Sequence, residues 1–471
     1  MRVDRRAWCG GRQAEHALSA RLELKNFLAG RGVVAGLLLT FAAGLAAIEH
    51  GRRVIDAQRT VLADSPRLQR EHLQKMLALH GANEADGPGN LLYYLNFFTQ
   101  REPSRFAPVA VGLRDVTPYN LKVRMLTLEG QIRDSDIGNP EAQALGHFDL
   151  TFLLSFLYPL LIMAFLHDTL SSEQESGTWA MIRAHPAPWA RVLIRKALLR
   201  FLPVPAVWLL TVLTACVLLR LPPDGRFAAW IALSLSYLAF WFALSLLVMA
   251  LGRPSTFNAT AMLSVWLLLA ILIPVTSNLA ISWALPSTDV LEAALRQREG
   301  YHGKWDRPRT ETMQAFHSRY PEYANWRAPE DKFSWAWYYA MQQQGDEESA
   351  QAVERFRGVQ KRREAWSRRL SWLAPPALLE SAMTRIAGTG LDAHTAYIDS
   401  VRGYHERVRR HFYPMLFRDP PVPPVDWRAI PIHRFSDEDP RTGFPGEVFV
   451  LLAPVVAVTL LACALLARGA D

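Results

Sequence analysis

The sequence predicts an all-α polytopic membrane protein with six transmembrane helices and two mainly helical extracytoplasmic inserts. The first observation is a set of six apolar runs of 17 to 25 residues that contain no Asp, Glu, Lys, Arg or His. Helices of that length cross the hydrocarbon core of a bilayer. The second observation is that the charges, 52 Lys and Arg against 44 Asp and Glu, gather between these runs.

The six predicted spans have sharp charged borders, such as Arg31 and Glu49 around the first and Arg253 before the fifth. We place the spans at residues 32–48, 150–166, 201–219, 227–251, 259–281 and 448–467.

The distribution of basic residues predicts the orientation, because Lys and Arg collect in short cytoplasmic segments. Residues 1–31 hold seven of them, and the loop 167–200 holds Arg183, Arg191, Arg195 and Lys196. We therefore expect a cytoplasmic N-terminal amphipathic segment, a cytoplasmic loop at 167–200 and a cytoplasmic C-terminus. The net charge of +8 then reflects membrane orientation, and we expect no nucleic acid partner.

The first run has an alternative interpretation as a cleaved signal peptide, because the stretch AGLAAIEHG at its end contains small residues. The basic region before it would then span residues 1–31, which is long for a signal peptide.

The cysteines exclude a disulfide framework in the inserts. The chain has Cys9, Cys216 and Cys463, of which the last two lie inside predicted spans. The inserts, 49–149 and 286–446, contain none, so any stability there comes from packing.

Helix formers dominate both inserts. Ser65 followed by Pro66 is typical of a capped helix start, and we expect further helices at 346–373 and 391–412. The proline-rich stretch 419–435 should be extended. The many tryptophans and tyrosines of the second insert are expected to pack in a core or anchor near lipid headgroups, with a ligand-stacking surface as the alternative.

The residue pattern shows no chemistry of its own. The single Gly-Lys pair, Gly303-Lys304, has Arg298 at the position where a phosphate-binding loop needs its first glycine. His405 and His411 in HERVRRH are six residues apart, which puts them on different helix faces and disfavours a zinc site. The spans lack the ionisable residues that ion-coupled transport requires.

The segment SEQESGTWAMIRAHPAPWARVLIRKAL, which starts at Ser172, contrasts with the apolar runs around it. Ser172 and Glu175 fit a capping box for a short helix, and Glu173 favours its N-terminus. Gly177 allows a close backbone approach, Pro186 ends the helix, and Trp179 and Ile182 share one face. The pattern predicts a short amphipathic helix between two spans.

This segment resembles the signature stretch of type-2 ABC exporter permeases. In that family the motif Ser-x-Glu-x-Glu-x-Gly-Thr is typically followed by a short apolar helix, a proline turn and basic residues. The matching residues here are Ser171, Glu173, Glu175, Gly177, Thr178, Pro186 and Lys196. The resemblance extends over 106–125, 139–166 and 373–401. Together these stretches resemble a bacterial branch of the family with large outer inserts. Gly390 departs from it, because an acidic residue is expected after Ala-Gly-Thr.

The resemblance implies the permease subunit of an ATP-driven exporter in the bacterial inner membrane, which is itself no enzyme. Its short helix would be the coupling helix that docks on an ATP-binding cassette subunit. The residues implied at that interface are Ser172, Glu173, Glu175, Gly177, Thr178, Trp179, Ile182 and Pro186. ATP and magnesium would be bound by that ATPase, and the other expected partners are membrane lipid and a second permease, identical or paralogous. The alternatives are a membrane-anchored sensor or scaffold and a membrane-bound hydrolase.

Overall fold

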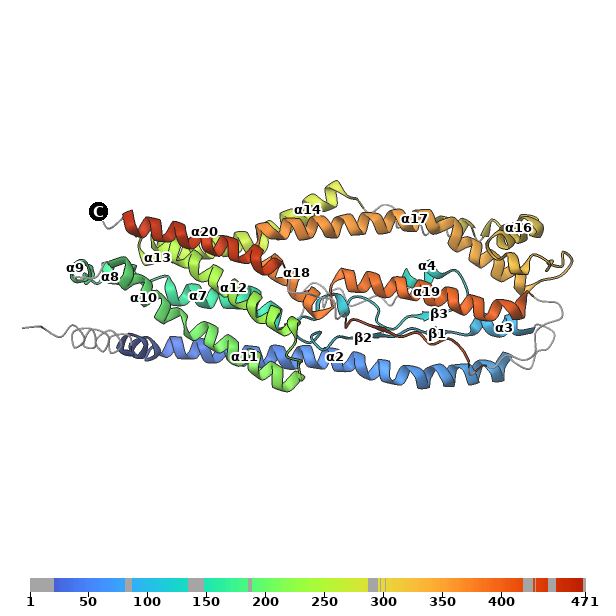
Figure 1. Cartoon of the computed structure of the whole chain (residues 1–471), viewed down its shortest axis with the longest axis horizontal. Coiled ribbons are helices and arrows are strands. Elements are labelled where there is room, and N and C mark those ends of the chain that lie inside the picture. The colour runs from blue at the N-terminus through green and yellow to red at the C-terminus, as the bar shows by residue number, and fades with distance from the viewer. Residues whose placement is uncertain are drawn as a thin grey trace, which may run out of the picture.

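Helices that run roughly along one long axis make up most of the molecule (Figure 1). The structure, a computed structural model, describes residues 21–80, 87–133, 148–184, 189–286, 295–296, 298–300, 302–417, 427, 429–438 and 446–468. Apolar helices form one end, here called the membrane bundle. The described parts of the two inserts form the other end, here called the outer domain.

Six helical segments of the bundle are long and apolar enough to cross a membrane, and they coincide with the six predicted spans. In chain order they comprise the first half of α2 (Arg31–His80); α6 (Leu150–Phe152), η2 (Leu153–Leu157) and α7 (Tyr158–Leu166); α10 (Trp189–Phe201) and α11 (Pro203–Leu219); α12 (Gly225–Met249); α13 (Ser255–Leu267), η3 (Leu268–Leu272) and α14 (Ile273–Ala284); and α20 (Glu447–Arg468).

The second and fifth spans share a local irregularity. Each contains one π-helical turn, η2 or η3, directly before a proline, Pro159 or Pro274. Proline has no N–H to donate and its ring crowds the preceding turn, so the wider turn accommodates it. Such π turns inside α-helices are points where a helix can bend.

The bundle core is rich in large aromatic side chains. Trp208, Trp230 and Trp241 are almost completely buried, and the Tyr237 hydroxyl donates to the carbonyl oxygen of Ser155 in η2 at 2.6 Å. That bond satisfies a buried hydroxyl inside an apolar environment and ties α12 to the π turn of the second span.

The two inserts fold together into the outer domain. Their elements are α3 (Gly87–Tyr94), β1 (Phe97–Phe98), β2 (Arg101–Glu102), η1 (Gly112–Arg114), β3 (Lys122–Val123) and α4 (Leu128–Arg133) from the first, and α16 (Arg309–Arg319), η4 (Pro321–Tyr323), α17 (Trp335–Leu370), η5 (Ser371–Leu373), α18 (Pro375–Ala387), α19 (Leu391–Leu416) and β4 (Phe435–Ser436) from the second.

A shared core and a shared strand pair join the inserts. Leu92 and Phe97 of the first insert pack in one cluster with Trp337, Tyr339 and Phe412 of the second. The antiparallel pair β1–β3 lies within the first insert, whereas β2 pairs in parallel with β4 of the second. The expected core role of the aromatics holds for these residues, while Trp366 and Trp372 are exposed.

Three details of the predicted helices were wrong. Ser65 and Pro66 start no helix, because α2 runs through them without interruption and carries the chain from the bundle into the outer domain. Ser65 is fully buried there. α17 begins at Trp335, where the Ser334 hydroxyl caps the helix by accepting from the N–H of Trp337. α19 starts at Leu391 as predicted but continues to Leu416. Much of 419–435 lies outside the described residues.

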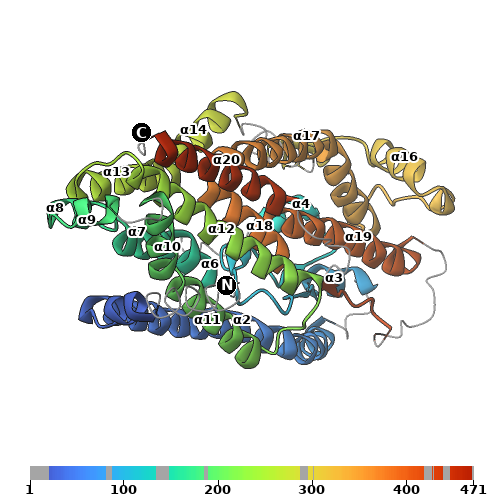
Figure 2. The ribbon, with the colours of Figure 1, turned by 60° about the vertical axis from the view of Figure 1, so that its left-hand side comes forward.

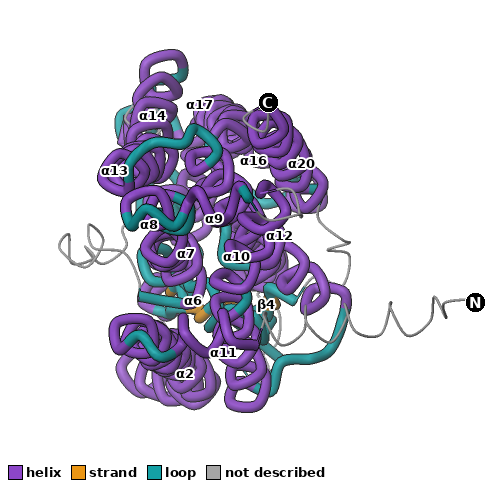
Figure 3. Tube along the Cα trace, turned by 90° about the vertical axis from the view of Figure 1, so that its left-hand side faces the viewer, coloured by secondary structure: helices purple, strands orange, loops and turns teal. Residues whose placement is uncertain are grey.

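The described ends of the chain lie at the bundle end of the molecule. The start of α2, the end of α20 and the loop helices α8 (Ser171–Glu175) and α9 (Trp179–Arg183) occupy that end (Figures 1 and 2), and Figure 3 views the molecule from it. The outer domain occupies the opposite end. The first and last described helices therefore lie at the same end of the molecule as α8 and α9.

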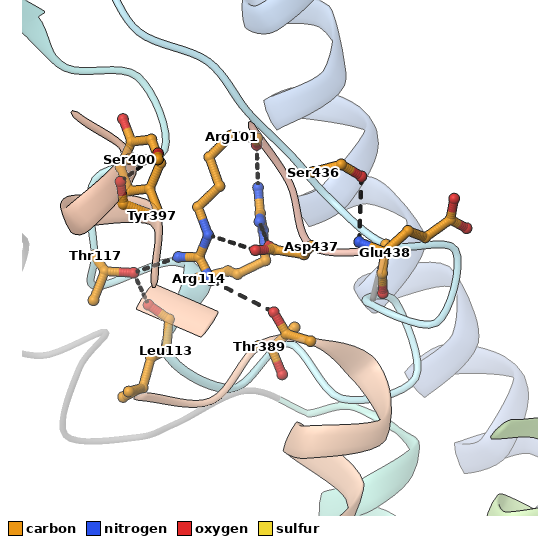
Figure 4. A network of polar contacts seen from close by, with 12 residues as sticks. Arg101, Leu113, Arg114, Thr117, Thr389, Tyr397, Ser400, Ser436, Asp437 and Glu438 are labelled. Carbon is orange, nitrogen blue, oxygen red and sulfur yellow. Dashed lines mark hydrogen bonds and ion pairs between the residues drawn. The ribbon is translucent and has the colours of Figure 1, made fainter. Parts of the chain in front are cut away.

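A buried ion cluster joins the two inserts of the outer domain (Figure 4). The Asp437 carboxylate accepts from Nε of Arg101 at 3.0 Å and from the guanidinium of Arg114, and all three side chains are buried. Arg114 also donates to Oε1 of Gln58 on α2 at 2.9 Å. The cluster therefore connects α2, the first insert and the end of the second insert.

The turn between α18 and α19 is fixed to the same region. Nη2 of Arg101 donates to the carbonyl oxygen of Gly388 at 3.4 Å, and the Thr389 hydroxyl donates to that of Ala110 at 2.8 Å. Gly388 has a φ of +68°, and an added Cβ would lie 2.8 Å from the carbonyl oxygen of Asp437. A side chain there would separate the turn from the cluster.

The ion cluster acts as a positioning device because its burial is costly. Burial outweighs the attraction between the charges, so that the pKa of Asp437 is raised and that of Arg114 is lowered to about 10. A buried pair of this kind adds little net stability, but removing one partner leaves uncompensated charge.

The expected topology can be checked by labelling single cysteines in a background without the three native ones. Ser176→Cys between α8 and α9 and Ser318→Cys on α16 are both at exposed positions. In intact cells an impermeant thiol reagent should label the second and not the first. Labelling of Ser176→Cys alone would show that the chain has the opposite orientation in the membrane.

Asp437→Asn should lower the free energy of unfolding of the full chain by about 3–5 kcal/mol, because two buried guanidinium groups lose their carboxylate. Urea unfolding in detergent, followed by tryptophan fluorescence, measures this. Glu438→Gln is the matched control, since Glu438 is 40% exposed and pairs more distantly with Arg105 and Arg226. An equal loss in both variants would contradict a special role of the cluster.

Candidate functional site

The α8–α9 element lies at the end of the bundle between the second and third spans. Gly177 separates the two helices with a φ of +78°, the left-handed region that favours glycine. Nothing lies within 4 Å of the position that a Cβ would take. Gly177 thus makes the turn between α8 and α9, and its outer side is open.

The predicted capping box of Ser172 and Glu175 is absent. α8 begins after Leu170 without a side-chain cap, because the N–H of Ser172 already donates to the carbonyl oxygen of Asp168 at 2.9 Å. Oε1 of Glu175 accepts instead from the N–H and hydroxyl of Ser255 at 2.9 and 2.8 Å. Glu175 therefore caps α13, the start of the fifth span.

Glu173 also bonds within the chain. Its carboxylate contacts the ammonium group of Lys196 on α10 and the hydroxyl of Thr178. The two glutamates thus attach α8 to the helices that lead into the third and fifth spans. They hold the element in place.

α9 has an inner and an outer face. On the inner face Trp179 packs edge-to-face on Trp189, with ring centroids 5.3 Å apart, and both lie against a small cluster with Leu170, Leu193 and Leu466. Ile182 is half-buried. On the outer face Met181 is 74% exposed. Pro186 lies outside the described residues.

A second candidate site is a cavity of about 1150 Å³ between the bundle and the outer domain. Its walls come from the end of α14, the start of α6, residues 110–116, the helices α17, α18 and α19, and the β4 segment. The ion cluster lies directly behind it, since Asp437 and Gly388 line the cavity. Sequence reasoning missed this site, because its wall residues come from six separate stretches without a local pattern.

Three carboxyl groups face the cavity from three helices: Glu364 from α17, Glu380 from α18 and Asp392 from α19. Burial and the neighbouring Asp392 carboxyl raise the pKa of Glu364 to about 7, although Arg368 and Arg385 oppose the shift. Burial, with a smaller contribution from Asp149, also raises the pKa of Glu380. The cavity wall therefore carries carboxyls that are costly to ionise.

The outer domain holds Gly390, where the chain departs from the resemblance, and the HERVRRH stretch, whose histidine spacing disfavours a zinc site. Gly390 is the residue before α19 and lines the cavity, so the acidic residue that the resemblance expects at this position is absent. His405 is buried against the carbonyl oxygen of Arg124 at 2.8 Å, and Glu406 accepts from Tyr320 and Arg410. Among the described residues no group of three His, Cys, Asp or Glu side chains could hold a metal ion.

Comparison with known proteins gives a family match to part of the chain. The model of a domain of unknown function, DUF3526, matches residues 291–436, which include α16 to β4 and the three cavity carboxyls. No curated protein and no solved structure matches the chain.

The raised pKa of Glu364 predicts a pH dependence of stability. Because the folded-state pKa lies above that of an unfolded glutamate, the protonated form stabilises the fold, and this contribution is lost as pH rises through about 7. Glu364→Gln should remove that loss, so that the variant unfolds at higher urea concentration than the wild type at pH 8 and at a similar concentration at pH 5.

Glu354→Gln is the control on the same helix, because Glu354 is exposed and pairs with Arg357 at 3.1 Å. It should leave the difference between pH 5 and pH 8 unchanged. A Glu364→Gln variant that keeps the full pH dependence of the wild type would show that Glu364 does not cause it.

Proposed function

We propose that this chain is the permease subunit of an ATP-driven ABC exporter and that α8–α9 docks on a separate ATPase subunit. The observation that carries the proposal is the α8–α9 element: two short helices with an exposed apolar residue, held at one end of the bundle by contacts to two spans. The match to a domain often found in ABC-transporter-like permeases supports it.

The outer face of α9 suits a docking surface. Met181 is a flexible apolar side chain with most of its surface exposed, and methionine adapts to shallow apolar grooves. Exposed apolar groups next to a charged rim are typical of the centre of a protein interface. Arg183 and Ala184 continue the exposed side of the helix.

The contacts behind α8 give docking a way to act on the spans. A displacement of α8 acts through Glu173 on Lys196 of α10 and through Glu175 on Ser255 of α13. The second span continues directly into this region through the turn after α7. Closure of the ATPases would thus move the second, third and fifth spans together.

The remaining components follow from the same assignment. ATP and magnesium are bound by the partner ATPase, and this chain performs no covalent chemistry. A second permease, identical or paralogous, completes the pathway in the bacterial inner membrane. Both termini and α8–α9 face the cytoplasm, where the ATPase is found.

Met181→Asp should reduce recovery of an ATP-binding cassette protein with the tagged chain from native membranes at least tenfold. A buried, unpaired carboxylate at the centre of an interface costs enough to abolish a moderate affinity. Because Met181 is exposed in the isolated chain, the variant should express and unfold like the wild type.

Leu79→Asp is the control, since Leu79 is 62% exposed near the far end of α2, and it should leave recovery unchanged. Glu175→Ala forms a second arm. It should keep the ATPase bound but weaken stimulation of ATP hydrolysis, because it removes the contact to α13. Full recovery of the ATPase with Met181→Asp would reject α9 as its docking surface.

A further inference from the structure

The cavity between the bundle and the outer domain has the size and lining of a ligand site. Its volume of about 1150 Å³ lies at the upper end of the roughly 300–1,000 Å³ typical of small-molecule sites. Apolar and aromatic groups from several elements line it, among them Leu113, Phe152, Ile281, Leu391 and Phe435. A mainly apolar ligand would find contact surface there.

The charged groups of the lining are mostly acidic, with seven carboxylates against three arginines. The carboxylates are Asp115, Asp149, Glu364, Glu380, Asp392, Asp437 and Glu438, and the arginines are Arg363, Arg368 and Arg385.

Several of these groups already have partners within the protein. Asp437 belongs to the ion cluster, and Glu438 pairs with Arg105 at 3.4 Å. Asp149 accepts from the N–H groups of Val111 and Phe152, both at 2.9 Å. Of the arginines, Arg385 pairs with Glu447 at the start of α20.

Two features of the remaining carboxyls favour the binding of a cation in the cavity. Glu380 is exposed and lines the cavity, and no hydrogen bond or ion pair holds its carboxyl among the described residues. Besides burial, the neighbouring Asp392 carboxyl, which lines the same cavity, raises the pKa of Glu364 by repulsion. A proton or a cation relieves such repulsion. The nearby cations, Arg368 of α17 and Arg385 of α18, do not cancel it.

We propose that this cavity binds an organic cation with an apolar body, held by the carboxyls of Glu364, Glu380 and Asp392. The aromatic rings of Phe152 and Phe435 add a second attraction for a cation. The inference deepens the proposed function by naming the substrate class, and it rests on that function only where transport is concerned.

The position of the cavity suits a ligand that leaves the bilayer. Its membrane-side wall contains Phe152 at the start of the second span and Ile281 near the end of the fifth. The opposite ends of these two spans approach α8–α9, through the turn after α7 and through the contact between Glu175 and Ser255. The same two spans therefore connect both candidate sites, and each contains a π turn.

The test uses two probes of nearly equal size and opposite charge, tetraphenylphosphonium and tetraphenylborate. Binding to the purified full-length chain in a neutral detergent is measured by equilibrium dialysis at pH 8. We expect tetraphenylphosphonium to bind at least tenfold more tightly. Equal binding of both probes would mean partition into apolar surface only, and preference for tetraphenylborate would mean that the arginines dominate. Either result overturns the proposal.

Glu380→Gln and Glu364→Gln should each weaken binding of the cation about tenfold, a loss that corresponds to about 1.4 kcal/mol, whereas Glu354→Gln on the outside of α17 should not. The affinity of the wild type should fall between pH 8 and pH 6, because protons compete for the same carboxyls. Unchanged affinity in the double variant Glu364→Gln/Glu380→Gln would refute the site.

The outcome separates the site from the transport function, because the binding measurement needs no ATPase. Cation binding that depends on Glu364 and Glu380 supports the site, even when no ATPase co-purifies, and in that case the permease proposal alone fails. Binding together with stimulated ATP hydrolysis supports both.

Discussion

The buried contact of Asp437 with Arg101 and Arg114 is the constraint from which the arrangement of the outer domain follows. Three charged side chains that are shielded from water have to remain together, because any one of them alone would be strongly unfavourable. Asp437 lies more than 300 positions from the two arginines in the chain. Their contact sets the register of β2 against β4 and brings the end of the second insert onto the first.

The same contact shapes the cavity. Gly388 and Thr389 hold the turn between α18 and α19 against the ion cluster, and this turn directs Glu380 and Asp392 toward one space from two different helices. α17 supplies Glu364 from a third side. The carboxyls therefore line one cavity because the ion cluster positions the elements that carry them, even though these elements lie apart in sequence.

The second and fifth spans relate the two candidate sites to each other. Both spans contribute to the cavity wall at one end and approach α8–α9 at the other, and both are interrupted by a π turn before a proline. Under the proposed function, a movement of α8–α9 would be transmitted along helices that already contain a place to bend. Glu173 and Glu175 would then serve as mechanical links, which agrees with their bonds to α10 and α13.

The sequence by itself determined the six apolar helices, their borders and the presence of a short polar element between the second and third. These features are local, since an uncharged run of about twenty residues is a helix in a bilayer whatever its neighbours are. In the outer domain, the later part of α17 and most of α19 were also readable from their composition. Ser65–Pro66 was misread, because packing of a buried Ser65 inside a long helix outweighs the local preference of a Ser-Pro pair for a helix start.

The tertiary structure decided everything that depends on distant partners. Glu175 could bond locally to the start of its own helix or to Ser255, and only the packed bundle selects the latter. The pairing of Asp437 with two arginines, the common core of the two inserts and the meeting of Glu364, Glu380 and Asp392 follow from contacts between separate stretches. No periodicity or spacing encodes such contacts, because their free energy exists only once the chain has folded.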